Sequence, residues 1–144
     1  MNALNRKLIT GGLSKPSKMP GYAYNLPATE CKVGAKLVQV PGSVCHGCYA
    51  LKGRYRFPNV KEAMHRRLKS IDGPLWVETM AADINARKSK YFRWHDSGDI
   101  QSLAHLKKIF DVCKLTPDVA HWIPTRESGI LSKIDPVEVP GNLT

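Results

Sequence analysis

The sequence has few acidic residues and no long apolar stretch. Against 22 Lys and Arg there are only 12 Asp and Glu, and the formal net charge is +10. This imbalance favours polyanionic partners, either nucleic acid or phosphorylated ligands. The opening Met-Asn-Ala-Leu-Asn-Arg-Lys is too polar for a secretory signal, and no apolar run approaches a membrane span. We therefore expect a cytoplasmic protein without a membrane partner.

Cysteines are also few. Four of them in a cytoplasmic chain are expected to be metal ligands, catalytic groups or core thiols rather than disulfides. At 144 residues and 42% hydrophobic, the chain is long enough for one core and too short for two well-built domains. We expect an irregular basic arm at 1–28, a single α/β domain at 29–134 and a tail at 135–144. The arm suits either contact with a phosphate backbone or a solvated leader.

Hydrophobic periodicity predicts alternating strands and helices in the central domain. Strands are expected at 36–40, 91–95 and 119–123, and helices at 58–71, 74–87 and 102–114. Asn59 should cap the first of these helices, and Cys113 lies on the apolar stripe of the last, as a core thiol would. The order strand, helix, strand is a βαβ unit with parallel strands. The fold class is therefore α/β, with a small and incomplete parallel (βα) barrel-like sheet.

Three cysteines form a candidate metal site. Cys45 and Cys48 are a Cys-x2-Cys pair in a loop bent by Pro and Gly, and Cys31 stands ahead of them. An iron-sulfur cluster can use three cysteines and leave one iron open. Structural zinc needs a fourth ligand. The available fourth ligands are His46, His65 and Cys113. The three thiols therefore favour an iron-sulfur cluster, with zinc as the alternative.

A second candidate group lies where the two later strands end. Parallel strands end at one edge of a sheet, where α/β proteins bind ligands. The loops at this edge are His95-Asp96-Ser97-Gly98-Asp99 and Thr125-Arg126-Glu127. The carboxylates of Asp96, Asp99 and Glu127 can hold a metal or accept protons, Arg126 can grip a carboxylate or phosphate, and His95 can move a proton. These five are the candidate catalytic residues, expected to border one pocket with the cysteine loop.

Each of these side chains also has a structural alternative. Asp99 can cap the helix that begins near Ser102, Arg126 can pair with Glu127, and His95 can be satisfied by hydrogen bonds inside the sheet. Taken one at a time, the residues fit a structural role as well as a functional one. Together, at neighbouring strand ends, they favour a site.

Four runs of the sequence carry a resemblance to a known family. They are Leu13-Ser14-Lys15-Pro16-Ser17-Lys18-Met19-Pro20, Val44-Cys45-His46-Gly47-Cys48-Tyr49-Ala50-Leu51-Lys52-Gly53, Phe92-Arg93-Trp94-His95-Asp96-Ser97-Gly98-Asp99 and Trp122-Ile123-Pro124-Thr125-Arg126-Glu127. In these runs, across most of residues 10–130, the chain resembles the phage gene product 88 family. The resemblance implies a phage protein in the cytoplasm of the infected host cell.

The cysteine loop and the later strand ends are also similar, more distantly, to radical S-adenosylmethionine enzymes. In those enzymes three cysteines after the first barrel strand hold a 4Fe-4S cluster, and a glycine-rich acidic turn after the second strand helps to hold S-adenosylmethionine. This resemblance implies that Cys31, Cys45 and Cys48 are the cluster ligands. The residues it implies for cofactor binding are Tyr49, Asp96, Ser97, Gly98, Asp99, Thr125 and Arg126.

These observations predict an iron-sulfur protein which, if it is catalytic, cleaves S-adenosylmethionine reductively. The charge suggests nucleic acid or a nucleotide as its substrate. The first alternative is a non-catalytic, zinc-bearing module that binds nucleic acid or a host protein. The second is a metal-dependent nuclease that uses Asp96, Asp99 and Glu127, with His95 nearby.

Overall fold

The structure of the chain is a computed structural model. It describes residues 2–16, 20–31, 36–37, 39–43, 46, 57–95 and 97–144. None of the helices in these ranges is long and apolar enough to cross a membrane.

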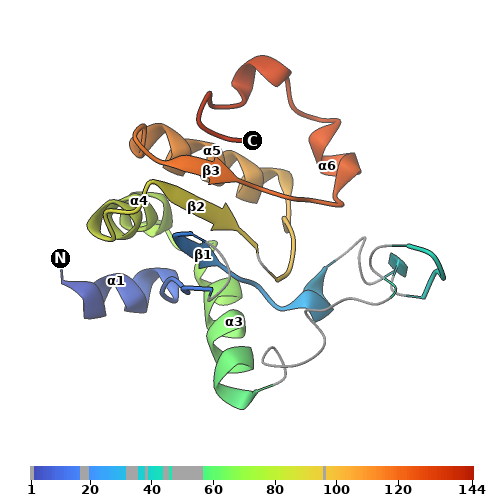
Figure 1. The fold of residues 1–144 in the computed structure, drawn as a ribbon, viewed down its shortest axis with the longest axis horizontal. Helices are drawn as coiled ribbons and strands as arrows, with labels where there is room; N and C mark the ends of the chain where they lie inside the picture. Colours follow the sequence, from blue (N-terminus) through green and yellow to red (C-terminus); the bar gives the residue numbers. More distant parts are fainter. Residues whose placement is uncertain are drawn as a thin grey trace.

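A small parallel sheet forms the centre of the fold (Figure 1). Its strands β1 (Tyr22–Tyr24), β2 (Tyr91–Trp94) and β3 (Ala120–Trp122) lie in that order, and both neighbouring pairs are parallel. Beyond β3, an isolated parallel bridge joins His121 to Leu143. The protein is therefore a mixed α/β fold with an open sheet, and barrel-like closure stays a prediction.

Five α-helices and two 3₁₀ turns accompany the strands in the described part of the chain. They are α1 (Ala3–Thr10), η1 (Ala28–Glu30), α3 (Pro58–Ser70), α4 (Trp76–Ala86), α5 (Leu103–Leu115), α6 (Ser128–Leu131) and η4 (Pro136–Glu138). The connection from β1 to β2 contains α3 and α4, and the connection from β2 to β3 is α5. This alternation of strands and helices is what keeps the strands parallel.

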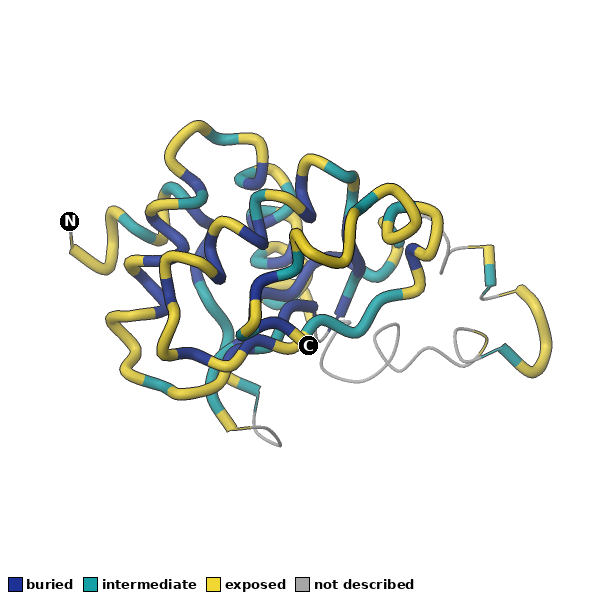
Figure 2. Tube along the Cα trace, turned by 90° about the horizontal axis from the view of Figure 1, so that it is seen from above, coloured by how far each residue is buried: buried dark blue, intermediate teal, exposed yellow. Residues whose placement is uncertain are grey.

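The core lies on one face of the sheet. Phe92 and Trp94 of β2 are buried, and Trp94 packs against Trp76 of α4 with ring centroids 6.0 Å apart. Side chains of α5 complete the same apolar cluster. In Figure 2 the buried segments lie mainly in the interior of the molecule, and exposed segments surround them. Because side chains alternate along a strand, the residues between these core positions point to the other face.

The predicted helices and the two later strands are confirmed. α3, α4 and α5 match 58–71, 74–87 and 102–114, and β2 and β3 match 91–95 and 119–123, to within two residues at each end. Cys113 is a buried core thiol, as expected. The expected cap is wrong, because the residue before α3 is Phe57, whose side chain makes no capping hydrogen bond, and Asn59 lies inside the helix.

The predicted strand at 36–40 is wrong, because residues 36–37 are helical and residues 39–43 form turns and bends. The third strand of the sheet is instead β1, inside the segment expected to be irregular. The same segment contains α1. Asn2 caps the start of this helix by accepting a hydrogen bond from the Asn5 amide, and Gly11, with a φ of 86°, ends it. The expected tail is also partly ordered: it contains η4, and Leu143 belongs to the core cluster.

Gly21 allows β1 to lie next to β2. Its φ is +83°, and an added Cβ would meet the carbonyl oxygen of Tyr91. Gly21→Ala should therefore lower the free energy of unfolding by at least about 2 kcal/mol, measured by urea denaturation. Gly129→Ala is the control, because a Cβ at Gly129 in α6 would meet nothing and should change stability by less than about 1 kcal/mol. Equal stability of the two variants would contradict this account of the β1–β2 pairing.

Candidate functional site

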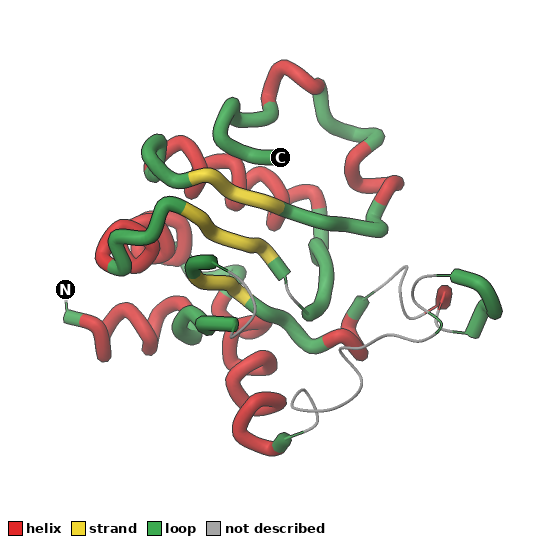
Figure 3. The backbone as a smooth tube through the Cα atoms, in the orientation of Figure 1, coloured by secondary structure: helices red, strands yellow, loops and turns green. Residues whose placement is uncertain are grey.

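The carboxyl ends of all three strands lie at one edge of the sheet, which we call the carboxyl edge. The three strands lie side by side in Figure 3, and because both neighbouring pairs are parallel, they end toward the same side of the sheet. After β1 the chain passes through η1 to Cys31, after β2 it continues to residues 95–99, and after β3 to residues 123–127. The segments that follow three separate strands therefore begin at this edge.

The carboxylate of Asp99 joins the β2 and β3 exits. Its Oδ1 accepts hydrogen bonds from the hydroxyl of Thr125 and, at 2.7 Å, from the amide of Ile100. Its Oδ2 accepts one from the amide of Arg126 at 2.8 Å. The Thr125 hydroxyl oxygen in turn accepts a hydrogen bond from the amide of Glu127 at 3.0 Å. Asp99 is buried, so these donors replace water around its charge. The two loops therefore meet at this edge, whereas the pocket that they were expected to border with the cysteine loop stays a prediction.

The β2 exit also contacts the β1 exit. The amide of His95 donates to the carbonyl of Tyr24 at 3.1 Å, and the amide of Leu26 donates to the carbonyl of Ser97 at 2.9 Å. Gly98 has a φ of 84°, and an added Cβ would lie 2.6 Å from the Cβ of Leu26. The close approach of the two exits therefore depends on glycine at this position.

Among the residues that the structure describes, four polar side-chain atoms near the β2 exit are buried without a hydrogen-bond partner. They are Nδ1 and Nε2 of His95, Oγ of Ser97 and Nε2 of His105. His95 and His105 are 3% and 2% exposed, and their ring centroids are 5.4 Å apart. Buried polar atoms are almost always paired in folded proteins. This cluster therefore suits a bound water, ion or ligand that supplies the missing partners.

Both imidazoles of this cluster are neutral at pH 7. Burial holds the pKa of His95 well below its usual value, and His105 and Arg93 lower it further. Burial and, to a smaller extent, Lys108 lower the pKa of His105 to about 4. A neutral imidazole can accept a hydrogen bond or bind a metal. His95 also has a φ of 63°, a left-handed conformation that costs free energy in a non-glycine residue and is found often at functional sites.

His105 was missed by the sequence analysis because it lies within the apolar stripe of α5. The side chain of Ser102 caps this helix by accepting from the His105 amide, and Nδ1 of His105 accepts from the amide of Gln101 at 3.1 Å. The available signal was the spacing between His105 and Ile109, four residues apart on the buried side of the helix. The cap at Ser102 also shows that Asp99 is not the cap of α5.

The structure places only part of the predicted metal site. Cys31 is half-buried at the end of η1, seven residues after the end of β1. Cys45, Cys48, Tyr49 and Asp96 lie outside the described residues. Within the described ranges, no group of three or more His, Cys, Asp or Glu side chains is arranged to hold a metal ion.

Arg126 and Glu127 differ in their surroundings. The side chain of Arg126 is exposed at the carboxyl edge, whereas Glu127 is buried at the start of α6. Arg126 can therefore reach a ligand at this edge. Thr125 is half-buried, and its hydroxyl is already held between Asp99 and the Glu127 amide.

The sequence model of one family, described as "Gene product 88", matches residues 2–144. No curated protein and no solved structure gives a significant match to the chain. The resemblance to this family is therefore confirmed over nearly the whole chain. The more distant similarity to radical S-adenosylmethionine enzymes gains no support from these comparisons.

Asp99→Asn should destabilise the junction of the two loops. An amide group can replace only one carboxylate oxygen as an acceptor, so one of the present donors would face an NH2 group. We expect the free energy of unfolding to fall by roughly 2 kcal/mol in urea denaturation, and the Arg126 amide to exchange faster with solvent. Asp111→Asn, at an exposed position of α5, is the charge-matched control. Unchanged stability together with a protected Arg126 amide would show that Asp99 does not hold the edge together.

Proposed function

The chain belongs to the gene product 88 family of phage proteins, and from this premise we propose that it holds a metal centre at its carboxyl edge. The proposed ligands are Cys31, Cys45 and Cys48, and the proposed centre is an iron-sulfur cluster. The small molecule bound beside it is proposed to be S-adenosylmethionine. The protein would then be a basic radical enzyme whose substrate is nucleic acid or a nucleotide.

The observation that supports this proposal most is the convergence of the three strand exits. The chain after the first strand reaches Cys31, the second strand leads to the buried histidine cluster, and the third leads to Thr125 and Arg126. The strands follow one another in space in the order of the sequence. α/β folds collect binding groups at the carboxyl ends of their parallel strands.

The donor chemistry also fits the proposed centre. Thiolates select iron-sulfur clusters or zinc over magnesium and calcium. Asp99, one of the three carboxylates of the metal-dependent nuclease alternative, already accepts hydrogen bonds from three protein groups. These contacts weigh against the nuclease alternative.

The residues of this chain would position the ligand and exclude water. When bound, an iron-sulfur cluster would supply an electron for reductive cleavage of S-adenosylmethionine. Arg126, exposed at the carboxyl edge, would pair with a carboxylate of the ligand. His95 and Ser97 would offer their unpaired polar atoms to it from the buried side. Asp99 would keep the loops that carry these groups at a fixed separation.

Metal analysis of the anaerobically purified full chain tests the proposal. We expect iron and acid-labile sulfide, with a brown colour, in the wild-type protein. Cys31→Ser, Cys45→Ser and Cys48→Ser should each lose most of the bound iron, because each removes one of three thiolate ligands. Cys113→Ala is the matched control, because this thiol is fully buried in the core and should leave the iron content unchanged.

The metal content distinguishes an iron-sulfur cluster, a zinc site and the absence of a metal at these cysteines. One equivalent of zinc without sulfide, lost in the same three variants, would replace the iron-sulfur proposal by the zinc-bearing module. A wild-type protein without iron or zinc, or iron that survives both Cys45→Ser and Cys48→Ser, would contradict a metal centre at these cysteines. Retention of iron in Cys31→Ser alone would remove Cys31 from the ligand set.

A separate observation favours nucleic-acid binding as a second candidate function. The face of the sheet opposite the core carries Tyr91 and Trp122, which are 53% and 49% exposed. The guanidinium of Arg93 lies over the Trp122 ring, 4.6 Å from its centroid. These residues line a hollow of about 350 Å³. Exposed aromatic rings beside Arg, on a chain of net charge +10, suit the stacking of single-stranded bases.

Trp122→Ala tests this second function. It should weaken binding of a labelled single-stranded oligonucleotide by about tenfold in fluorescence anisotropy at fixed salt, because one base would lose its stacking surface. Phe57→Ala removes another half-exposed aromatic side chain, next to α3, and should have little effect. If both variants bind as the wild type does, or if the wild type binds no oligonucleotide, this face is not a base-stacking surface.

A further inference from the structure

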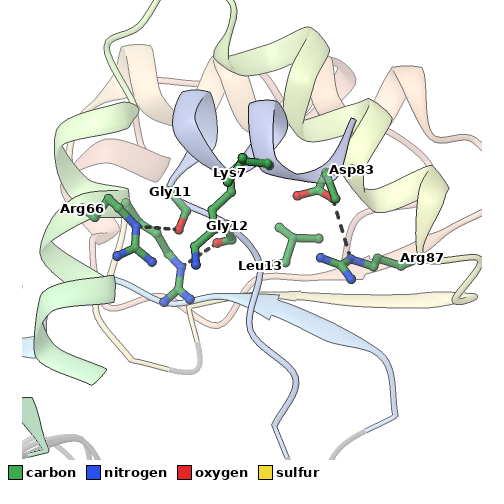
Figure 4. Close-up of a pocket in the computed structure, with 10 residues that line it drawn as sticks. Lys7, Gly11, Gly12, Leu13, Arg66, Asp83 and Arg87 are labelled. Carbon is green, nitrogen blue, oxygen red and sulfur yellow. Dashed lines mark hydrogen bonds and ion pairs between the residues drawn. The ribbon is translucent and has the colours of Figure 1, made fainter. Parts of the chain in front are cut away.

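A basic pocket of about 400 Å³ lies between α1, α3 and α4, apart from the carboxyl-edge residues. Figure 4 shows its labelled lining residues, with Lys7 reaching down from α1, Arg66 from α3 and Arg87 from α4. Gly11, Gly12 and Leu13 form the wall that follows α1. None of the residues proposed above for the metal centre lines this pocket.

The positive charge of the pocket exceeds the negative charge that the described residues bring to it. Asp83 is the one carboxylate among the lining residues, and its Oδ1 is already engaged by Nε of Arg6 at 3.1 Å and Nε of Arg87 at 3.7 Å. Within the described residues, Lys7, Arg66 and Arg67 have no ion-pair partner. Three cations therefore share this pocket with no counter-charge of their own.

Arg67 provides the clearest sign that this pocket suits an anion. It is only 6% exposed, yet its guanidinium is held by neutral groups: Nε donates to the carbonyl of Gly12 at 2.7 Å and Nη1 to that of Asn25 at 3.3 Å. Burial lowers the pKa of Arg67 to about 10, Tyr24 opposes this shift and Arg66 adds to it. Arg67 is still charged at pH 7. A buried cation normally has an anionic partner, because its desolvation is otherwise costly.

The two neighbouring arginines are held in place by consecutive carbonyls. Arg66 Nε donates to the carbonyl of Gly11 at 3.2 Å, and Arg67 donates to the next carbonyl in the chain. Gly11 has a φ of +86°, and an added Cβ would lie 2.7 Å from the Cα of Arg67. The turn after α1 can therefore lie this close to α3 only because position 11 is glycine. The bonds through Nε leave the terminal guanidinium nitrogens of Arg66 available for an anion.

We propose that this pocket binds the phosphate monoester or polyphosphate end of a small, nucleotide-sized ligand. Guanidinium groups bind phosphate oxygens through paired hydrogen bonds, and three cations without a counter-charge match a group with two or more negative charges. A backbone diester carries only one charge for each phosphate. The pocket volume lies within the usual range for small-molecule sites. Leu4 and Leu13 provide apolar contact for the rest of the ligand.

Calorimetric titration of the full chain with inorganic pyrophosphate and with a nucleoside triphosphate tests the proposal. Arg66→Gln and Lys7→Gln should each weaken binding by about tenfold, because each removes a charged donor to the phosphate. Lys61→Gln is the matched control, since it removes one charge from an exposed position of the same helix as Arg66 but outside the pocket. It should bind as the wild type does, within about twofold.

A thermal-shift measurement separates loss of binding from loss of folding. Arg66→Gln should melt cooperatively without ligand, and at the same concentration pyrophosphate should raise the melting temperature of the wild type more than that of this variant. Arg66→Lys, which keeps the charge, should recover part of the binding. Equal weakening by Lys61→Gln and Arg66→Gln would show only general charge attraction and overturn the proposal. No binding of either probe to the wild type, or oligonucleotide binding that depends on Arg66 and that pyrophosphate does not compete with, would overturn it as well.

Discussion

The hydrogen bonds to the carboxylate of Asp99 decide the shape of the carboxyl edge. In the described part of the chain the sheet has three short strands and two isolated bridges, so the strands alone do little to position the loops that follow them. Asp99 ties the β2 exit to the backbone and hydroxyl of the β3 exit, and the Leu26–Ser97 hydrogen bond ties it to the β1 exit. The edge is therefore a single unit built from three distant parts of the chain.

The two faces and the carboxyl edge of the sheet have different roles. One face is filled by α4 and α5 and stabilises the fold, while the opposite face exposes the aromatic side chains of Tyr91 and Trp122 beside the half-buried Arg93. At the edge, His95, Ser97 and His105 each bury at least one polar atom that has no hydrogen-bond partner among the described residues, which costs stability in the absence of a ligand. The buried charge of Arg67 poses the same problem in the basic pocket. Both features suit a protein in which a bound ligand supplies partners for buried polar and charged groups.

Much of the fold could be predicted because its larger helices have clear apolar stripes and β2 and β3 are rich in aromatic residues. α1 and β1 could not, since a helix of eight residues held by its caps and a three-residue strand are too short to show a period. The run at 36–40 has strand composition without strand structure. Short elements depend on tertiary partners that composition does not reveal.

The meeting of the β2 and β3 loops could also be predicted, because a βαβ unit brings both exits to one edge. His105 was hidden in a core stripe. The basic pocket could not be foreseen, because it forms only where α1, itself not predicted, packs against α3 and α4. The sequence did predict that Asp99 belongs to this edge. The donors around its carboxylate could be identified only from the three-dimensional structure.

The central claim is that cysteines far apart in the chain bind one metal centre beside this edge. X-ray absorption at the metal edge of the anaerobically purified full chain tests it most directly. The account predicts a first coordination shell made mainly of sulfur, with iron neighbours beyond it. A shell of nitrogen and oxygen without sulfur would contradict the account, because the metal would then be bound by groups other than the cysteines.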